Sequence, residues 1–378
     1  MSRRRRAQGA MLVGSLAAVL TLSATGITTL ASKGATNWSK VTSAAAGGGM
    51  AALIKAAKKE GQLTVTTLPD NWANYGAIIK DFSKKYGIKI TDENPEGSSQ
   101  YEVDAMQELA GTSREPDVLD MGPPFAVEAD QDHLLAPYKV AEWKEIASDE
   151  KASDASWYYD YGGYISIGYN AGVIKTAPTS FASLTNPEFK GGIGLNGNPT
   201  DAGAAFAAVF AAALANGGNF NNIEPGINFF KTLGEDGNFV PAQSTEATIA
   251  SGQIHASLDW DYLNVEYAHQ LKGTVDWKVI VPKDGKYAAY YCQAISKDAP
   301  HPAAARLWEE YLYSTVGQNL WLEGYARPVL LSQMIKAGTA NKKALAAIPA
   351  VSGSPTFPSL AQQAAQKQVV LQQWSTVP

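Results

Sequence analysis

Residues 62–94 read QLTVTTLPDNWANYGAIIKDFSKKYGIKITDEN and contain a complete strand–helix–strand unit. The runs 62–68 and 88–94 are rich in apolar and β-branched residues, which is typical of strands. Between them, aromatic and apolar residues recur at helical spacing from Tyr75 to Tyr86. Two strands joined by a helix in this way lie parallel, with a right-handed crossover. The stretch therefore predicts an α/β fold.

The same alternation continues along the chain. A third strand is expected at 116–122, and the small-residue run 161–174 predicts a strand that could cross between two units. A new unit begins at 190–198, and further strands are expected at 254–260 and 287–296. Strands that alternate with helices in two successive sets predict two α/β lobes.

Acidic and aromatic residues follow these strands repeatedly, as in ASLDWDY at 256–262. Ligands of open parallel sheets bind outside the carboxyl ends of the strands. The polar loops expected at those ends are 69–75, 121–124, 196–201, 243–246, 259–262 and 290–291. We expect them to face one cleft.

The N-terminus has the pattern of a secretory signal peptide. Four arginines precede the apolar run 10–31, which contains Thr, Ser and Gly and ends in a small residue. A retained membrane anchor is the alternative, and the export route could be Sec or twin-arginine. The polar segment 32–49 is expected to be a flexible lead.

Composition excludes several classes of protein. Of 378 residues, 45% are hydrophobic, which is too many for a disordered chain. Removing residues 1–31, which carry four arginines and no acid, changes the formal net charge from −5 to −9. An acidic chain argues against nucleic acid as a partner. The single cysteine, Cys292, permits no internal disulfide.

The ordered set of motifs resembles the extracellular solute-binding proteins of ABC importers, more closely their polyamine/iron-type cluster. The residues that carry the resemblance include GYISIGYNAGVI at 163–174, TIASGQIHASLDWDY at 248–262 and EGYARPV at 323–329. The likeness extends over about residues 50–350.

The resemblance implies a periplasmic-binding-protein-like type II fold, with two lobes, a hinge and an interlobe cleft. Lobe one would comprise residues 50–163 and 292–326, and lobe two residues 168–288 and 328–378. It also implies a monomer that works outside the cytoplasm, binds a small-molecule solute and passes it to a membrane ABC permease. No cofactor is expected.

The residues themselves favour a cationic or zwitterionic amine. An aromatic face attracts an ammonium group by about 0.5–2 kcal/mol, and a carboxylate adds a charge-assisted hydrogen bond. The resemblance adds Asn71, Tyr75 and Tyr325, and it gives Trp260 a stacking role. The candidate ligand-binding residues are Asp70, Asn71, Trp72, Tyr75, Asp120, Asn198, Asp201, Trp260, Asp261, Tyr290, Tyr291 and Tyr325.

Several of these residues have other readings. Thr200 or Asp201 would cap the helix that follows, and free amides there would attract an anion. Tyr290 and Tyr291 replace the tryptophan and aspartate that polyamine binders have in this stretch. Adjacent tyrosines could hold ferric iron, although successive strand residues point to opposite faces.

A binding role is expected rather than catalysis. The sequence contains no P-loop, dinucleotide fingerprint or G-x-S-x-G elbow, and no metal cluster is recognised. Arg327 could grip a carboxylate or phosphonate, or form a surface ion pair. The alternatives to an amine receptor are a ferric-ion or aminophosphonate binding protein and an exported hydrolase on a two-lobed scaffold.

Overall fold

The computed structural model describes residues 36–351 and 357–378. The predicted signal peptide, 1–31, lies outside the described residues. The chain divides into two compact units, Met1–Thr36 and Asn37–Pro378.

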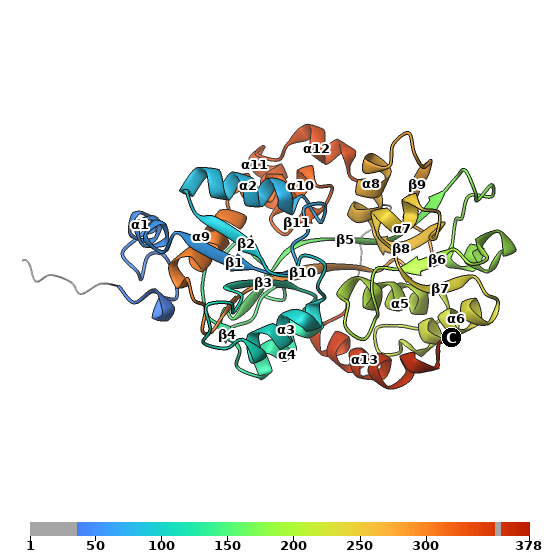
Figure 1. Cartoon of the computed structure of the whole chain (residues 1–378), viewed down its shortest axis with the longest axis horizontal. Helices are drawn as coiled ribbons and strands as arrows, with labels where there is room; N and C mark the ends of the chain where they lie inside the picture. The colour runs from blue at the N-terminus through green and yellow to red at the C-terminus, as the bar shows by residue number, and fades with distance from the viewer. Residues whose placement is uncertain (1–35, 352–356) are drawn as a thin grey trace, which may run out of the picture. The chain divides into compact units, whose positions relative to one another are not determined.

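One long strand, β5 (Trp157–Asn170), passes through both lobes (Figure 1). Its first part pairs antiparallel with β10 (Ala288–Ser296), and its last part pairs antiparallel with β8 (Ala256–Trp260) and β9 (Trp277–Ile280). Because β5 and β10 both continue across the middle of the molecule, they form the connection about which the lobes can move.

In the described residues, lobe one contains a two-stranded sheet, one part of the nine-stranded sheet that continues into lobe two, and the helices around them. Strands β1 (Gln62–Val65) and β2 (Lys89–Asp92) are parallel, and β3 (Val118–Met121) and β4 (Leu135–Ala136) pair with β10. Its helices are α1 (Met50–Glu60), α2 (Tyr75–Tyr86), α3 (Ser99–Glu108), α4 (Pro123–Gln131), α9 (Pro302–Leu312) and α10 (Thr315–Glu323).

Lobe two contains β6 (Ile193–Leu195), which lies parallel between β7 (Phe239–Gln243) and β8. Its central helix, α5 (Gly203–Ala215), carries no charged side chain and is buried from Ala204 to Ala213. A helix that is apolar on every side is stable only inside a core. The other helices are α6 (Glu224–Glu235), α7 (Glu246–Ala250) and α8 (Asp261–Gln270).

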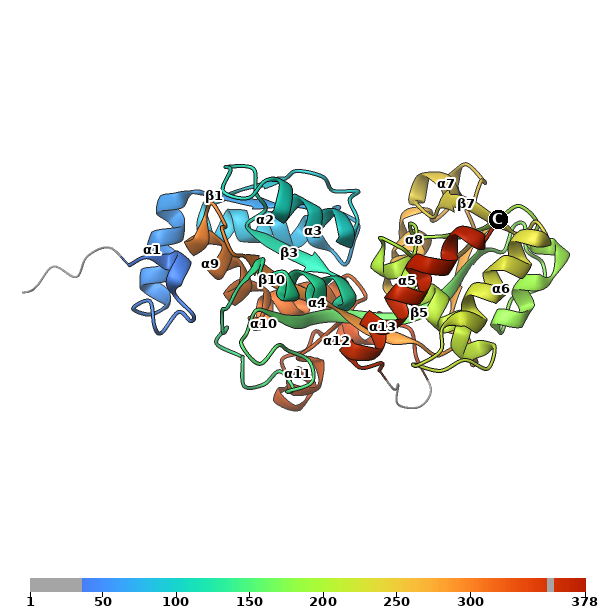
Figure 2. The same ribbon diagram turned by 90° about the horizontal axis from the view of Figure 1, so that it is seen from below.

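The C-terminal elements lie across both lobes. Strand β11 (Arg327–Pro328) pairs with β5, after which come α11 (Leu331–Ala337) and α12 (Lys342–Ala347). The last helix, α13 (Leu360–Gln373), packs against α4 and α6 (Figure 2). The predicted boundaries of the lobes, including 328–378 in lobe two, stay a prediction.

The α/β fold class agrees with the sequence, but the sheets are mixed. The expected parallel pairing occurs at β1–β2 and at β6–β7 and β6–β8, whereas the crossing strands pair antiparallel. The described part of the expected flexible lead, residues 36–49, is also folded. Trp38 is buried, and the guanidinium of Arg306 donates to the carbonyl of Val41 at 2.7 Å.

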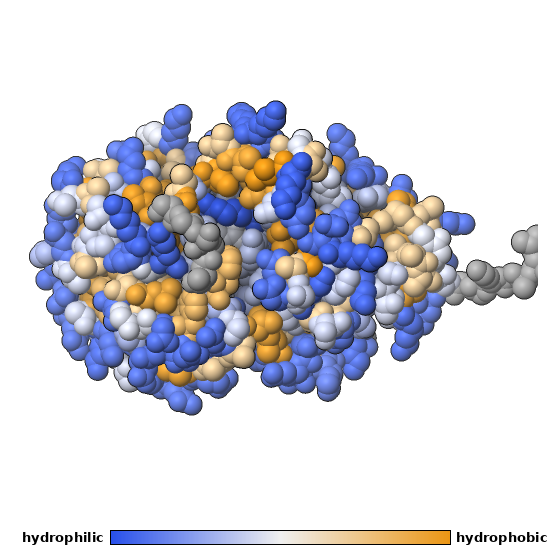
Figure 3. Space-filling view, turned by 180° about the vertical axis from the view of Figure 1, so that it is seen from behind, coloured by the Kyte–Doolittle hydropathy of each residue, from blue (hydrophilic) through white to orange (hydrophobic). Residues whose placement is uncertain are grey.

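Among the described helices, none has both the length and the apolar character needed to cross a membrane. Large apolar side chains reach the surface at a few scattered positions, and on the face shown in Figure 3 hydrophilic residues lie between smaller hydrophobic areas. These exposed side chains are Met50, Val173, Val316, Ile335, Phe357 and Leu371.

Candidate functional site

A cavity of about 540 Å³ is lined by residues of both lobes. Lobe one contributes the loop before α2, the turn before α3 and strand β3, and lobe two contributes the starts of α5 and α7 and part of α8. The lining residues include Asn71, Trp72, Glu96, Glu102, Asp120, Asn198, Asp201, Gly203, Glu246, Tyr267 and Tyr291. The volume is in the range of small-molecule sites.

The charged side chains on the cavity wall are all acidic. Five carboxyl residues line it, and among the described lining residues there is no lysine, arginine or histidine. Three large aromatic residues, Trp72, Tyr267 and Tyr291, complete the wall. Carboxyl groups beside ring faces can hold an ammonium group.

Trp72 is held in place by its neighbours from the crossing strand and α8. Its indole nitrogen donates a hydrogen bond of 2.6 Å to the hydroxyl of Tyr161. Its ring makes edge-to-face contacts with Tyr262 and Tyr291, with centroids 6.2 and 5.6 Å away. These contacts fix the ring at the cavity wall.

Asp120, on β3, is 5% exposed and lies at the floor of the cavity. Its Oδ2 accepts a hydrogen bond of 2.7 Å from the Tyr161 hydroxyl, while Oδ1 has no partner in the described part of the chain. Burial raises the pKa of Asp120 to about 6, against which the Tyr161 hydrogen bond acts.

Glu102, on α3, is a second buried acid on the wall. Its carboxyl accepts hydrogen bonds from the Thr67 hydroxyl and from the backbone N–H of Asp120, the latter at 2.9 Å. Burial raises the pKa of Glu102 well above its ordinary value. Both acids therefore hold protons more tightly than they would in water, and an approaching cation would favour their release.

The start of α5 differs from the prediction. Neither Thr200 nor Asp201 caps it: the N-cap is Ala202, which has no side chain to accept a bond. The backbone N–H of Thr200 instead donates a hydrogen bond of 3.0 Å to the side-chain oxygen of Asn198. As a result, no hydrogen bond is found for the first amides of α5 among the described residues. Such free N–H groups attract negative charge.

The two lobes touch beside the cavity. The backbone N–H of Gln100, on α3, donates a hydrogen bond of 3.2 Å to the backbone carbonyl of Asp201. At the starts of α4 and α5, Gly122 and Gly203 meet so closely that a Cβ on Gly203 would lie 3.4 Å from the Cα of Gly122. The structure therefore has the lobes closed at this point.

The structure brings six of the twelve predicted residues to the cavity wall and leaves six away from it. Those on the wall are Asn71, Trp72, Asp120, Asn198, Asp201 and Tyr291. Those that do not line it are Asp70, Tyr75, Trp260, Asp261, Tyr290 and Tyr325. That the first six contact a ligand stays a prediction.

Trp260 and Asp261 lie behind the wall because a helix, not a loop, follows β8. Trp260 is 2% exposed and its ring stacks on Tyr262, with centroids 6.2 Å apart. Asp261 is fully buried and forms an ion pair of 2.6 Å with Arg327. The pair uses both charges within the protein, so neither is offered to a solute.

The two adjacent tyrosines point to opposite faces of β10. Tyr291 lines the cavity, whereas Tyr290 stacks on Tyr159, with centroids 5.4 Å apart. Burial raises the pKa of both hydroxyls, which disfavours the tyrosinate form that iron requires. In the described part of the chain, no group of three or more His, Cys, Asp or Glu side chains that could hold a metal ion is found.

The remaining predicted residues are used elsewhere. Tyr75 is buried, and its hydroxyl accepts a hydrogen bond of 2.9 Å from Gln293. Asp70 is exposed on the loop before α2. Tyr325 is partly buried, with a positive φ of 66°.

Sequence reasoning missed Glu96, Glu102, Glu246 and Tyr267, which line the cavity. Glu102 lies in a predicted helix, on the same face as the buried Met106. An acid at a buried helical position was therefore a usable signal. The other three residues lie on loops or helix faces whose orientation depends on the tertiary fold.

Comparisons with known proteins agree with this architecture. Residues 113–350 match the family model described as bacterial extracellular solute-binding protein. The periplasmic binding protein AfuA from Actinobacillus pleuropneumoniae, with fructose-6-phosphate bound, is 17% identical, with a TM-score of 0.67 over 84% of this chain and 98% of that one.

Two further solved structures are similar. Iron-bound HitA from Pseudomonas aeruginosa is 19% identical, with a TM-score of 0.59 over 84% of this chain and 99% of that one. A spermidine/putrescine ABC transporter protein from Listeria monocytogenes is 14% identical, with a TM-score of 0.59 over 83% and 99%. These similarities show the two-lobed type II fold. Curated protein sequences give no match.

Proposed function

Because this chain belongs to the bacterial extracellular solute-binding proteins, we propose that it captures a small amine-bearing solute, polyamine-like or zwitterionic, outside the cytoplasm. As the substrate-binding component of an ABC transporter, it hands the solute to a membrane permease. The proposed export signal is the N-terminal segment 1–31. The lobes would close on the solute about β5 and β10.

The observation that carries the amine assignment is the charge of the cavity wall. Five carboxyl residues line it without a basic partner among the described lining residues. A bound cation would relieve their mutual repulsion. The ring of Trp72 would cover the ammonium group or the adjoining methylenes.

The uncapped start of α5 favours a second candidate, a zwitterion such as an aminophosphonate. The first amides of α5 without a hydrogen bond belong to a helix start that lines the same cavity as the acids, at Ala202, Gly203 and Ala204. An anionic group would bind there while the ammonium group binds near Asp120. The acids on the wall argue against a solute that carries negative charge alone.

A receptor fits these residues better than a catalyst. The acids of the wall belong to different loops, helices and a strand, and the described lining residues contain no cysteine or histidine. Cys292 is fully buried and burial raises the pKa of its thiol, which keeps it unreactive.

The test is calorimetric titration of the protein with spermidine, putrescine, 2-aminoethylphosphonate, fructose-6-phosphate and ferric citrate. Spermidine or putrescine is expected to bind, and strong binding of the aminophosphonate alone would select the zwitterion. Binding of only fructose-6-phosphate or ferric citrate contradicts the amine assignment. Mass spectrometry of the ligand after release checks that it leaves unchanged, and a modified ligand would indicate an enzyme.

A further inference from the structure

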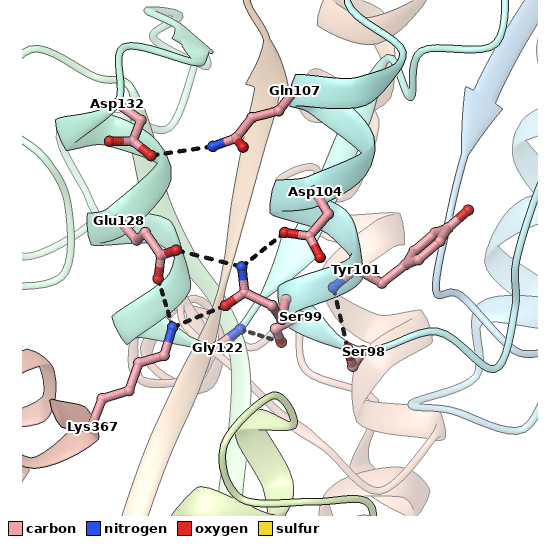
Figure 4. A network of polar contacts seen from close by, with 10 residues as sticks. Ser98, Ser99, Tyr101, Asp104, Gln107, Gly122, Glu128, Asp132 and Lys367 are labelled. Carbon is pink, nitrogen blue, oxygen red and sulfur yellow. Dashed lines mark hydrogen bonds and ion pairs between the residues drawn. The ribbon is translucent and has the colours of Figure 1, made fainter. Parts of the chain in front are cut away.

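The C-terminal helix α13 carries a buried lysine that reaches from lobe two to lobe one. The ammonium group of Lys367 lies 2.6 Å from Oε2 of Glu128 on α4 and 3.2 Å from Oε1 of Gln100 on α3. It also lies 3.7 Å from the centre of the Phe125 ring. Figure 4 shows Lys367 approaching from its own helix to meet the ends of α3 and α4.

Besides α4 of lobe one, α13 contacts lobe two. The amide of Ile223, just before α6, donates to the side chain of Gln366 at 2.8 Å. Beyond the end of the helix, the Trp374 ring contacts Phe230 and Phe239, with centroids 5.6 and 6.2 Å away. Helix α13 therefore connects the two lobes, and separating them has to break its contacts on one side.

Lys367 also lies next to the contact that closes the cavity. Gln100, which accepts a hydrogen bond from Lys367, directly follows Ser99, a residue of the cavity wall. The backbone N–H of Gln100 donates to the backbone carbonyl of Asp201 in lobe two. The Gln100 side chain is shared in turn between Asp104 at 3.1 Å and Glu128 at 3.4 Å (Figure 4). One polar network thus joins α13, α3 and α4 at the rim of the cavity.

We propose that Lys367 is a latch: its bonds to Glu128 and Gln100 hold the lobes in the closed position, and opening breaks them. The side chain of Lys367 is 5% exposed while that of Glu128 is 37% exposed. On opening, Glu128 is therefore hydrated easily, whereas the lysine has to leave its site over the Phe125 ring. The latch acts on closure whichever solute the cavity takes.

The burial of Lys367 sets how strongly its bonds favour the closed form. A charge-assisted hydrogen bond at a largely buried site contributes more than a surface ion pair, whose contribution is close to zero. Its loss is expected to lower the ratio of closed to open protein by about tenfold. A lysine with only a packing role would change the stability of α13 without changing this ratio.

The test measures the distance between spin labels on Lys84→Cys in lobe one and Lys231→Cys in lobe two, in solute-free protein. Both positions are exposed, and Cys292 is buried and unreactive toward the label. The wild type is expected to populate both the shorter, closed separation and a longer, open one. Lys367→Met keeps the apolar stem and is expected to shift the population toward the longer separation.

Charge reversal separates the ion pair from packing. Lys367→Glu and Glu128→Lys are each expected to favour the open separation, and the double variant is expected to recover part of the closed population. The matched control is Lys278→Met, which removes an ion pair with Asp276 whose side chains are 54% and 60% exposed. It is expected to change nothing.

Two results would overturn the latch. One is an unchanged distance distribution in Lys367→Met, in both charge reversals and in Glu128→Gln, a milder change at the more exposed partner. The other is opening in the single charge reversals with no recovery in the double variant. Urea unfolding of each variant separates loss of the fold from loss of closure.

Discussion

The indole nitrogen of Trp72 lies 2.6 Å from the hydroxyl oxygen of Tyr161. The same hydroxyl donates to Asp120 at 2.7 Å, so two hydrogen bonds in series join the ring and the carboxyl of the cavity wall. Tyr161 belongs to β5, the strand that passes through both lobes. The connecting strand thus orients two candidate ligand contacts, although Tyr161 itself does not line the cavity.

The first prediction concerns pH. Because the pKa of Asp120 is raised to about 6, its carboxyl becomes protonated below that pH and no longer attracts a cation. The affinity for spermidine is expected to fall by up to about tenfold per pH unit below pH 6. Asp120→Asn is expected to bind weakly at every pH. Calorimetry from pH 5 to 8 checks this, and a level profile in the wild type contradicts it.

The second prediction follows from the Tyr161 hydroxyl, which lowers the pKa of Asp120. Tyr161→Phe keeps the ring that stacks on Tyr291, with centroids 5.8 Å apart, but removes the hydrogen bond. The pH midpoint of spermidine binding is expected to rise above that of the wild type. The control is Tyr164→Phe on the same strand, which is expected to leave the midpoint unchanged. Equal midpoints in all three proteins would contradict the role of the hydroxyl.

The alternation of strands and helices could be predicted because each element carries its own local pattern. The expected helix with Ser98 or Ser99 at its cap is α3, capped by Ser98, and the expected closing helix is α13. The antiparallel pairing of β5 with β8 could not be predicted, since no residue pattern encodes which strand lies beside which. Helix α8 was missed, because ASLDWDY reads equally well as a strand that ends in a loop.

The candidate site was predicted only where the chain itself fixes the direction of a side chain. Tyr291 and Tyr290 occupy opposite faces of β10, as their alternation requires. Which of the two faces of β10 lines the cavity depends on packing between distant strands. The burial of Asp261 could not be predicted either, because its partner Arg327 lies 66 residues later.

The third prediction tests closure at the contact between Gly122 and Gly203. A Cβ on Gly203 would lie 3.3 Å from the Tyr291 hydroxyl and 3.4 Å from Gly122, so the branches of a valine there have no room. Gly203→Val is expected to hold the lobes apart and to weaken spermidine binding by at least tenfold. The urea midpoint is expected to change little, because an open lobe relieves the clash. A large loss of stability with unchanged affinity contradicts this reading.

The fourth prediction concerns the buried ion pair between Asp261 and Arg327, whose atoms lie 2.6 Å apart. Arg327→Met leaves the carboxyl of Asp261 buried without its counter-charge, which costs about 3–5 kcal/mol of unfolding free energy. Adding Asp261→Asn is expected to restore much of the lost stability, because the asparagine side chain carries no charge. Urea unfolding at pH 7 measures both variants. If the double variant is no more stable than Arg327→Met, the cost does not come from the unpaired charge.

The fifth prediction separates Trp260 from the cavity wall. Its ring is 2% exposed and packs among Tyr262, Tyr287 and Tyr291. Trp260→Ala is expected to cost about 3–5 kcal/mol of unfolding free energy through the space it leaves. Trp72→Ala, at the partly exposed ring on the wall, is expected to cost less stability and to weaken spermidine binding by about tenfold.

Urea unfolding and calorimetric titration with spermidine compare the Trp260 and Trp72 variants directly. Trp260→Phe fills most of the space and is expected to bind spermidine nearly as the wild type does, because its indole nitrogen makes only a long bond of 3.4 Å to Tyr291. If Trp260→Phe loses binding while Trp72→Ala retains it, the solute does not occupy the cavity beside Trp72. The stacking contact would then lie on the Trp260 side of Tyr291.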